Sequence, residues 1–103
     1  MKRGGMLRKN YSKTGRLCRV TFDIPPEADI KTASVCGEFN EWNKTAHPMK
    51  QRKDGRFSTT ISLAAGRPYR FKYLLNGNQW ENDVDADDYV PNEFGTEDSL
   101  VRV

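Results

Sequence analysis

The clearest pattern in this 103-residue chain is an alternation of apolar and polar side chains with a period of two. It is present in three segments, 18–24, 57–63 and 69–75. Side chains on a strand point alternately to opposite faces, so each segment predicts a half-buried β-strand. Cys18, Val20 and Phe22 then share the inward face. Shorter apolar stretches predict further strands at 33–39, 49–53 and 99–103.

Turn-forming residues separate these segments. Asp54–Gly55 and Asn76–Gly77 are dipeptides typical of hairpins, because glycine accepts the positive φ that a type I′ turn requires. The Asn-rich segment 37–43 predicts a tight turn, and the acidic segment 81–95 predicts a long loop. No segment has the helical period of 3.6. The pattern therefore predicts an all-β fold, an antiparallel β-sandwich.

Length and charge divide the chain into two parts. Residues 1–15 have no apolar period and are rich in Lys and Arg, so we expect a flexible basic N-terminal segment. Residues 16–103 are expected to form one sandwich domain. The basic segment could touch nucleic acid, but a solvated tail is the preferred interpretation and no nucleic-acid partner is expected. No apolar run approaches the roughly 20 residues of a membrane span, and a signal peptide is not evident. We therefore expect a cytoplasmic protein with no membrane partner.

Residues that could carry catalysis or bind a metal are few. Cys18 and Cys36 are widely spaced and are expected to be buried thiols rather than a disulfide. His47 is the single histidine, and no residue near it in sequence could orient it. The acidic run that begins at Asp83 lacks the glycine and the glutamate of a calcium loop. We expect no catalytic residue, no metal and no cofactor, and therefore no enzyme activity.

The two tryptophans carry the functional prediction. Trp42 and Trp80 both have polar neighbours, unlike a core tryptophan on an apolar strand face. A flat aromatic ring complements the apolar C–H face of a glucose unit, and polar side chains can replace the water around its hydroxyls. Lys72 points away from the core face. The candidate sugar ligands near the two tryptophans are Lys72, Asn40, Asn43, Asn78 and Gln79. In the alternative interpretation, each turn folds back and buries its indole.

A set of short motifs resembles carbohydrate-binding module family 48, which includes the glycogen-binding module of the AMP-activated protein kinase β subunit and the early-set domains of isoamylases and branching enzymes. The residues that carry the resemblance are Val35–Trp42, Pro48–Met49, Asp54–Phe57, Gly66, Tyr69–Tyr73, Asn76–Gly77 and Trp80. The resemblance runs from about Leu17 to Val103. It implies an immunoglobulin-like antiparallel β-sandwich of the early-set type.

The resemblance also implies a sugar site. Trp42 and Trp80 match the stacking tryptophans of the family, and Lys72 matches a lysine that bonds sugar hydroxyls. A loop near the C-terminus is implied to contribute Phe94, Thr96 and Asp98. Three departures stand out: Asp98 replaces an expected asparagine, Phe94 replaces an aliphatic residue, and Asn78 is one extra residue before Trp80.

These observations lead to one functional expectation and one alternative. We expect a non-catalytic module that binds an α-1,4-glucan such as glycogen, starch or a maltooligosaccharide. In the alternative, the sandwich has lost sugar binding and serves as a protein-interaction or spacer module of a glycogen-metabolising enzyme or regulatory complex. In either case a glycogen-metabolising enzyme is a candidate partner.

Overall fold

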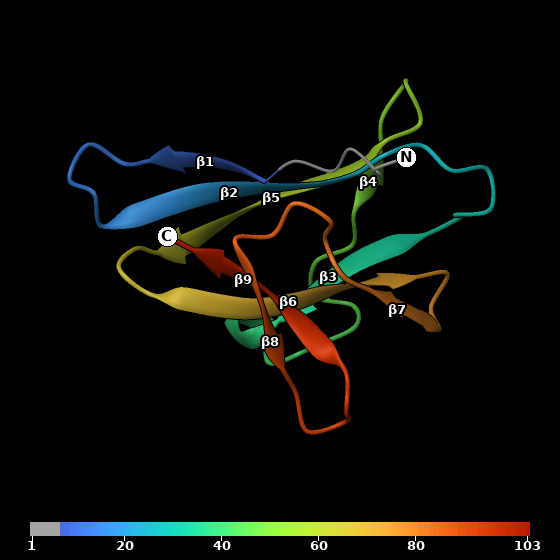
Figure 1. Cartoon of the computed structure of the whole chain (residues 1–103). Helices are drawn as coiled ribbons and strands as arrows, with labels where there is room; N and C mark the ends of the chain where they lie inside the picture. Colours follow the sequence, from blue (N-terminus) through green and yellow to red (C-terminus); the bar gives the residue numbers. More distant parts are fainter. Residues whose placement is uncertain (1–6) are drawn as a thin grey trace.

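Two antiparallel sheets pack face to face in the computed structural model, which describes residues 7–103 (Figure 1). The four-stranded sheet has the order β1 (Arg8–Tyr11), β2 (Leu17–Ile24), β5 (Phe57–Ala64) and β4 (Lys50–Gln51). The five-stranded sheet has the order β3 (Ala33–Gly37), β6 (Pro68–Leu75), β9 (Glu97–Arg102) and β8 (Asp88–Pro91), and β7 (Gln79–Glu81) pairs with β6. A 3₁₀ turn, η1 (Glu38–Asn40), follows β3. The all-β sandwich is confirmed, and its arrangement agrees with an immunoglobulin-like fold.

The core lies between the sheets and is built by the alternating segments. Phe22 of β2 and Phe71 of β6 are fully buried, and their ring centroids lie 5.0 Å apart at an edge-to-face angle of 68°. Burying one such side chain contributes about 1.5–3 kcal/mol. Cys18 and Val20 share the inward face with Phe22, as the alternation predicted. Because each alternating segment has one apolar face, these contacts set which face of each sheet is left for solvent or ligands.

The pairing of β2 with β5 shows how strictly the two faces are separated. The ladder runs over eight residue pairs, from Leu17 with Ala64 to Ile24 with Phe57. Thr21 and Thr60 face each other on the outer side, with their hydroxyls 2.9 Å apart. A slip of one residue would move the apolar set to the outer face, so burial fixes the register.

The N-terminal segment differs from the expectation. Arg8–Tyr11 form the edge strand β1, in register with Cys18–Thr21 of β2, so the prediction of a flexible segment over 1–15 is wrong for these four residues. All four are exposed. An edge strand held by main-chain hydrogen bonds, with no buried face, leaves no apolar alternation in the sequence. Residues 1–6 lie outside the described part of the chain.

Two further local expectations are corrected. The acidic segment 81–95 is not one long loop, because β7 ends at Glu81 and β8 occupies Asp88–Pro91. Strands of three and four residues are too short to show a period. Asn76 and Gly77 both have positive φ (54° and 76°), as a type I′ turn requires, whereas at Asp54–Gly55 only Gly55 does (92°). The strands β4 and β5 pair on either side of Asp54–Gly55, so the hairpin predicted there is confirmed, but the type I′ turn is wrong.

The remaining chain-level features concern the cysteines and the membrane. Cys18 and Cys36 are both buried free thiols, on β2 and β3 respectively. Burial raises the pKa of the Cys36 thiol. Among residues 7–103, no helix has the length and apolar content needed to cross a membrane.

Candidate functional site

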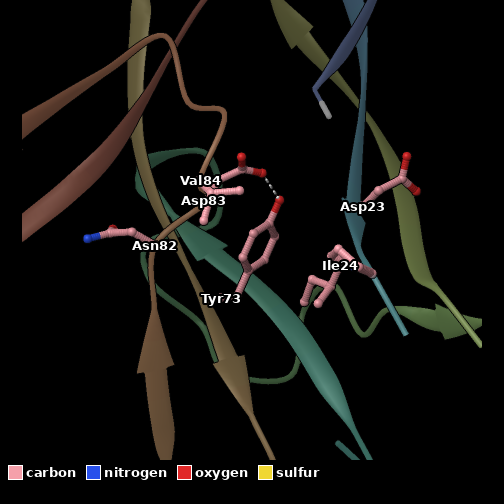
Figure 2. Close-up of a pocket in the computed structure, with 7 residues that line it drawn as sticks. Asp23, Ile24, Tyr73, Asn82, Asp83 and Val84 are labelled. Atoms are coloured by element: carbon pink, nitrogen blue, oxygen red, sulfur yellow. Dashed lines mark hydrogen bonds between the residues drawn. The ribbon is translucent and has the colours of Figure 1, made fainter. Parts of the chain in front are cut away.

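A broad groove of about 1010 Å³ lies on the outer face of the five-stranded sheet, on the side away from the core. Its lining residues are Trp42, Lys44, Arg70, Lys72, Trp80, Pro91, Asn92, Glu93, Phe94, Thr96 and Asp98. A second cavity, lined by Asp23, Tyr73 and Asp83 among others, encloses about 10 Å³ (Figure 2). That volume holds about one water molecule, so this cavity is too small for a sugar ring, unlike the groove.

The turn after β3 brings Trp42 to the groove. Gly37 is buried against β6, where an added Cβ would lie 2.4 Å from the Arg70 carbonyl oxygen. Glu41 and Trp42 then both take left-handed backbone conformations, with φ of 55° and 58°, and the Trp42 N–H donates to the Gly37 carbonyl at 2.9 Å. Consecutive non-glycine residues in this region are uncommon and point to a local functional constraint. The Trp42 side chain is half-buried at the groove wall.

Asn40 is placed differently from the prediction. Its Oδ1 accepts a hydrogen bond from the Gly37 N–H at 3.0 Å. Its Nδ2 donates to the Val35 carbonyl at 3.0 Å and contacts His47 Nδ1 at 2.9 Å. The amide is therefore occupied inside the turn, and Asn40 is not among the groove-lining residues. Its side chain braces the turn that carries Trp42, and His47 takes part in the same bracing.

Trp80 and Lys72 reach the groove from the adjacent strands β7 and β6. Trp80 pairs with Leu74 and keeps 41% of its surface exposed. Lys72 Nζ donates to the Glu97 carbonyl at 3.0 Å. The groove thus brings together both indoles and Lys72 on one surface. The alternative in which both turns bury their indoles does not describe Trp80.

The hairpin between β8 and β9 lines the far side of the groove. This hairpin extends beyond the sheet (Figure 1). Asn92 holds this hairpin, because its Oδ1 accepts from the N–H groups of Phe94 (3.0 Å) and Thr96 (3.1 Å). Its Nδ2 donates to Asp98 Oδ1 at 2.8 Å. Phe94 is 81% exposed. The sequence reasoning missed Asn92, although an asparagine opening the Asn92–Thr96 turn is a usable signal.

Arg70 and Lys44 also line the groove and were not predicted as site residues. Arg70 shares the outward face of β6 with Lys72, a signal already present in the alternation. Arg70 Nη1 donates to the Pro91 carbonyl at 3.0 Å and lies 3.5 Å from Asp98 Oδ2. Asp98 is 6% exposed. The groove therefore carries three cations, two carboxylates (Glu93 and Asp98) and three aromatic rings.

A buried hydrogen-bond network anchors the connection between β7 and β8. The Tyr73 hydroxyl points at Asp83 and donates to its Oδ2 at 2.5 Å (Figure 2). The Asp83 N–H donates to Ser99 Oγ at 2.9 Å. Burial raises the pKa of the Asp83 carboxyl, and burial together with the nearby carboxylate raises the pKa of Tyr73 well above its ordinary value. This network fixes the chain between Trp80 and the hairpin that carries Phe94.

The described part of the chain offers no obvious metal centre. Within residues 7–103, no three His, Cys, Asp or Glu side chains are grouped so that they could hold a metal ion. The groove chemistry is instead aromatic rings combined with hydrogen-bond donors, the combination suited to an uncharged polar ligand with apolar faces.

Comparison with known proteins identifies relatives of this chain. Residues 21–103 match the family described as the glycogen recognition site of AMP-activated protein kinase. A 1,4-alpha-glucan branching enzyme of Mesorhizobium japonicum is 38% identical over 48 residues, covering 45% of this chain and 6% of the enzyme. A chloroplastic/amyloplastic 1,4-alpha-glucan-branching enzyme of Oryza sativa subsp. japonica is 33% identical over 61 residues, covering 52% of this chain and 7% of the enzyme. The chain thus matches only a small fraction of the length of these curated relatives.

Proposed function

This chain belongs to the family of the glycogen recognition site of AMP-activated protein kinase, a family of non-catalytic carbohydrate-binding modules, and from this premise we propose that it binds α-1,4-glucan in its groove. The ligand would be glycogen, starch or a maltooligosaccharide. Glucose rings would stack on Trp42 and Trp80, and Lys72 would donate to their hydroxyls. Phe94 and Thr96 would contact the same chain from the hairpin.

The observation that carries this proposal is the convergence of both indoles on one groove. Each indole offers a wide apolar surface to the C–H face of a sugar, while Lys72 and Thr96 line the same groove and can bond hydroxyls. Two platforms at about 1 kcal/mol each, reduced by the entropy lost on binding, predict modest affinity. The two relatives are 1,4-alpha-glucan branching enzymes, which supports the same ligand chemistry.

A fluorescence titration tests the proposal, because Trp42 and Trp80 are the two tryptophans of the chain. We expect maltoheptaose and β-cyclodextrin to change the emission saturably as sugar stacks on the indoles. Cellohexaose is the matched control, since it contains the same glucose units in a straight β-1,4 chain and should have little effect. No response to maltoheptaose at millimolar concentration would overturn the proposal.

A second candidate function is favoured by one observation. The matched segments make up only 6% and 7% of the two branching enzymes, so the homologous region in those proteins is a small part of a larger enzyme. The module would then act as a docking or spacer unit for a glycogen-metabolising enzyme. This candidate predicts that such an enzyme binds the module equally well with and without excess maltoheptaose. Competition by the sugar would contradict it and favour the groove as a glucan site.

A further inference from the structure

We infer that Arg70 is a glucan-contacting residue of the groove, and that Asp98 acts through it as a positioning residue rather than as a sugar ligand. The inference rests on the proposed glucan site and assigns to it a second hydroxyl donor beside Lys72. Neither the alternation of the sequence nor the matched relatives assigned a role to Arg70.

Asp98 has little left to offer a ligand. Its Oδ1 accepts from Asn92 Nδ2 at 2.8 Å, and its Oδ2 lies 3.5 Å from Arg70 Nη1. The residue is 6% exposed, so its carboxylate is covered by its own partners. An ionised carboxylate is an acceptor only and cannot donate to a sugar oxygen. Its chemical role in the groove is therefore to hold Arg70.

Arg70 has the donors that Asp98 lacks. A guanidinium carries five N–H donors in a fixed fork. The contacts of Arg70 within residues 7–103 use Nη1, which donates to the Pro91 carbonyl at 3.0 Å and faces Asp98. The Nε and Nη2 groups are left for an external acceptor. The side chain is 37% exposed and lines the groove, so those donors require water or ligand oxygen.

Arg70 lies between the two walls of the groove. Its backbone N–H donates to Glu38 Oε1 at 2.7 Å, which ties it to the turn that carries Trp42. Its guanidinium binds the Pro91 carbonyl at the base of the hairpin that carries Phe94. A glucan lying across Trp42 and the Phe94 hairpin would pass over this residue. The planar fork suits two neighbouring ring hydroxyls, which a single lysine nitrogen cannot match.

The pairing with Asp98 also defines the kind of ligand. The carboxylate offsets the charge of the guanidinium, so Arg70 can donate hydrogen bonds without attracting anions strongly. Holding Nη1 in place reduces the rotamer freedom that a long side chain would otherwise lose on binding. We therefore expect a neutral glucan to be preferred over an anionic ligand at this position. Removal of the Asp98 charge should reverse that preference.

The test compares wild type, Arg70→Met, Asp98→Asn and the double variant by calorimetric titration with maltoheptaose, and records the melting temperature of each. Arg70→Met should lose about tenfold in affinity, the usual effect of removing hydrogen bonds from a charged donor. Asp98→Asn should lose several-fold on its own and nothing further in the Arg70→Met background. Arg19→Met, on the outer face of the four-stranded sheet, is the matched control and should leave affinity unchanged.

Competition by inorganic phosphate tests whether Asp98 positions and neutralises Arg70 or only stabilises the fold. Millimolar phosphate should compete with maltoheptaose in Asp98→Asn, where the guanidinium charge is unopposed, and not in the wild type or in Arg70→Met. Wild-type affinity in Arg70→Met, or additive losses in the double variant, would overturn the inference while leaving the glucan site standing. A wild type that binds no maltoheptaose would instead overturn the glucan site itself, and this assignment with it.

Discussion

The two halves of the sandwich carry opposite net charge. Segments 7–24 and 50–67, which form the four-stranded sheet and its turns, contain ten Lys or Arg and two Asp; segments 25–49 and 68–103 contain five Lys or Arg and twelve Asp or Glu. Yet the candidate site lies on the face of the acidic half. Trp42, Trp80 and Phe94 gather there, whereas Tyr11 is the exposed aromatic on the basic sheet. The proposed ligand is neutral, so converging rings and hydrogen-bond donors, rather than net charge, single out this face.

The backbone explains why only one face is hollowed. On the four-stranded sheet, β2 and β5 pair over eight residues without interruption, and the outer hydroxyls of Thr21 and Thr60 satisfy each other. On the five-stranded sheet, one edge of β6 is shared by β9 and β7, which pair with its two halves in turn. The left-handed turn at Trp42 and the hairpin at Phe94 then rise as walls. Regular pairing gives a flat face, and interrupted pairing gives a groove.

The largest expected effect is on the backbone that supports one wall. Gly37→Ala would place a Cβ 2.4 Å from the Arg70 carbonyl, although φ of −171° suits any residue, so the cost is steric. We expect a loss of about 1–3 kcal/mol in the free energy of unfolding and weaker maltoheptaose binding, because the Trp42 turn must shift. Urea unfolding and calorimetry measure the two effects.

The control for this variant lies in the hairpin of the other sheet. Gly15 has φ of 72° and nothing within 4 Å of an added Cβ. Gly15→Ala should cost about 1 kcal/mol through backbone strain and leave sugar affinity unchanged. Equal loss of sugar affinity in the two variants would show that the turn before Trp42 has no special role.

The second-largest effect is expected from removing an aromatic ring, which should lower sugar affinity on one outer face and not on the other. Trp80→Ala should weaken maltoheptaose binding by about tenfold or more, about 1.4 kcal/mol, because a stacking platform is lost. Tyr11→Ala removes an exposed ring of the four-stranded sheet and should have no effect on affinity. Calorimetry measures both affinities. An equal loss in the two variants, or no loss in either, would contradict a sugar site confined to the outer face of the five-stranded sheet.

Lysine substitutions give a smaller contrast. Lys72→Met keeps most of the stem and removes the ammonium, so we expect a loss of about three- to tenfold in affinity from the missing hydrogen bonds. Lys50→Met makes the same change on β4 of the four-stranded sheet. Its affinity should stay within error of the wild type in the same titration. A larger loss of affinity in Lys50→Met than in Lys72→Met would place the ligand on the four-stranded sheet and contradict the proposed groove.

The smallest contrast is in pH dependence. Burial raises the pKa of Asp83, so its contribution to stability is greatest at low pH and declines as pH rises above the ordinary value of 3.8. A hydrogen bond from the Arg56 backbone N–H lowers the pKa of Asp54, so its contribution is lost as pH falls below 3.8. Urea unfolding across pH should therefore show opposite slopes for Asp83→Asn and Asp54→Asn relative to the wild type. If the difference in unfolding free energy from the wild type changed with pH in the same direction for both variants, the opposite pKa shifts of Asp83 and Asp54 would be contradicted.

The sequence predicted the strands that have one buried face and also the short exposed strand β4, but it missed β1 and β8. The alternation in β2, β5 and β6 follows directly from burial against the other sheet, so period alone identifies them. The edge strand β1 is exposed on both faces, and β7 and β8 are three and four residues long. Main-chain hydrogen bonds stabilise such strands and impose no constraint on side-chain type. The apolar–polar pattern therefore does not predict these strands.

The candidate site was likewise predicted in part from the sequence. The structure brings Trp42, Trp80, Lys72, Phe94, Thr96 and Asp98 to one groove. Asn40 could not be placed from sequence, because an amide beside a tryptophan can face a ligand or brace a turn, and here it braces the turn. The turn position of Asn92 and the outward position of Arg70 were available from local patterns, but the contact of Arg70 with Pro91 joins β6 to the β8–β9 hairpin, which no local pattern encodes.

Amide and indole chemical shifts recorded during a maltoheptaose titration test the central claim most directly. We expect the indole N–H signals of Trp42 and Trp80 and the amide signals of Phe94 and Thr96 to move and saturate together. Signals from β1 and from the outer positions Thr60 and Ser62 should stay fixed. Shifts confined to the four-stranded sheet, or an unchanged spectrum at millimolar sugar, would contradict a glucan site in this groove.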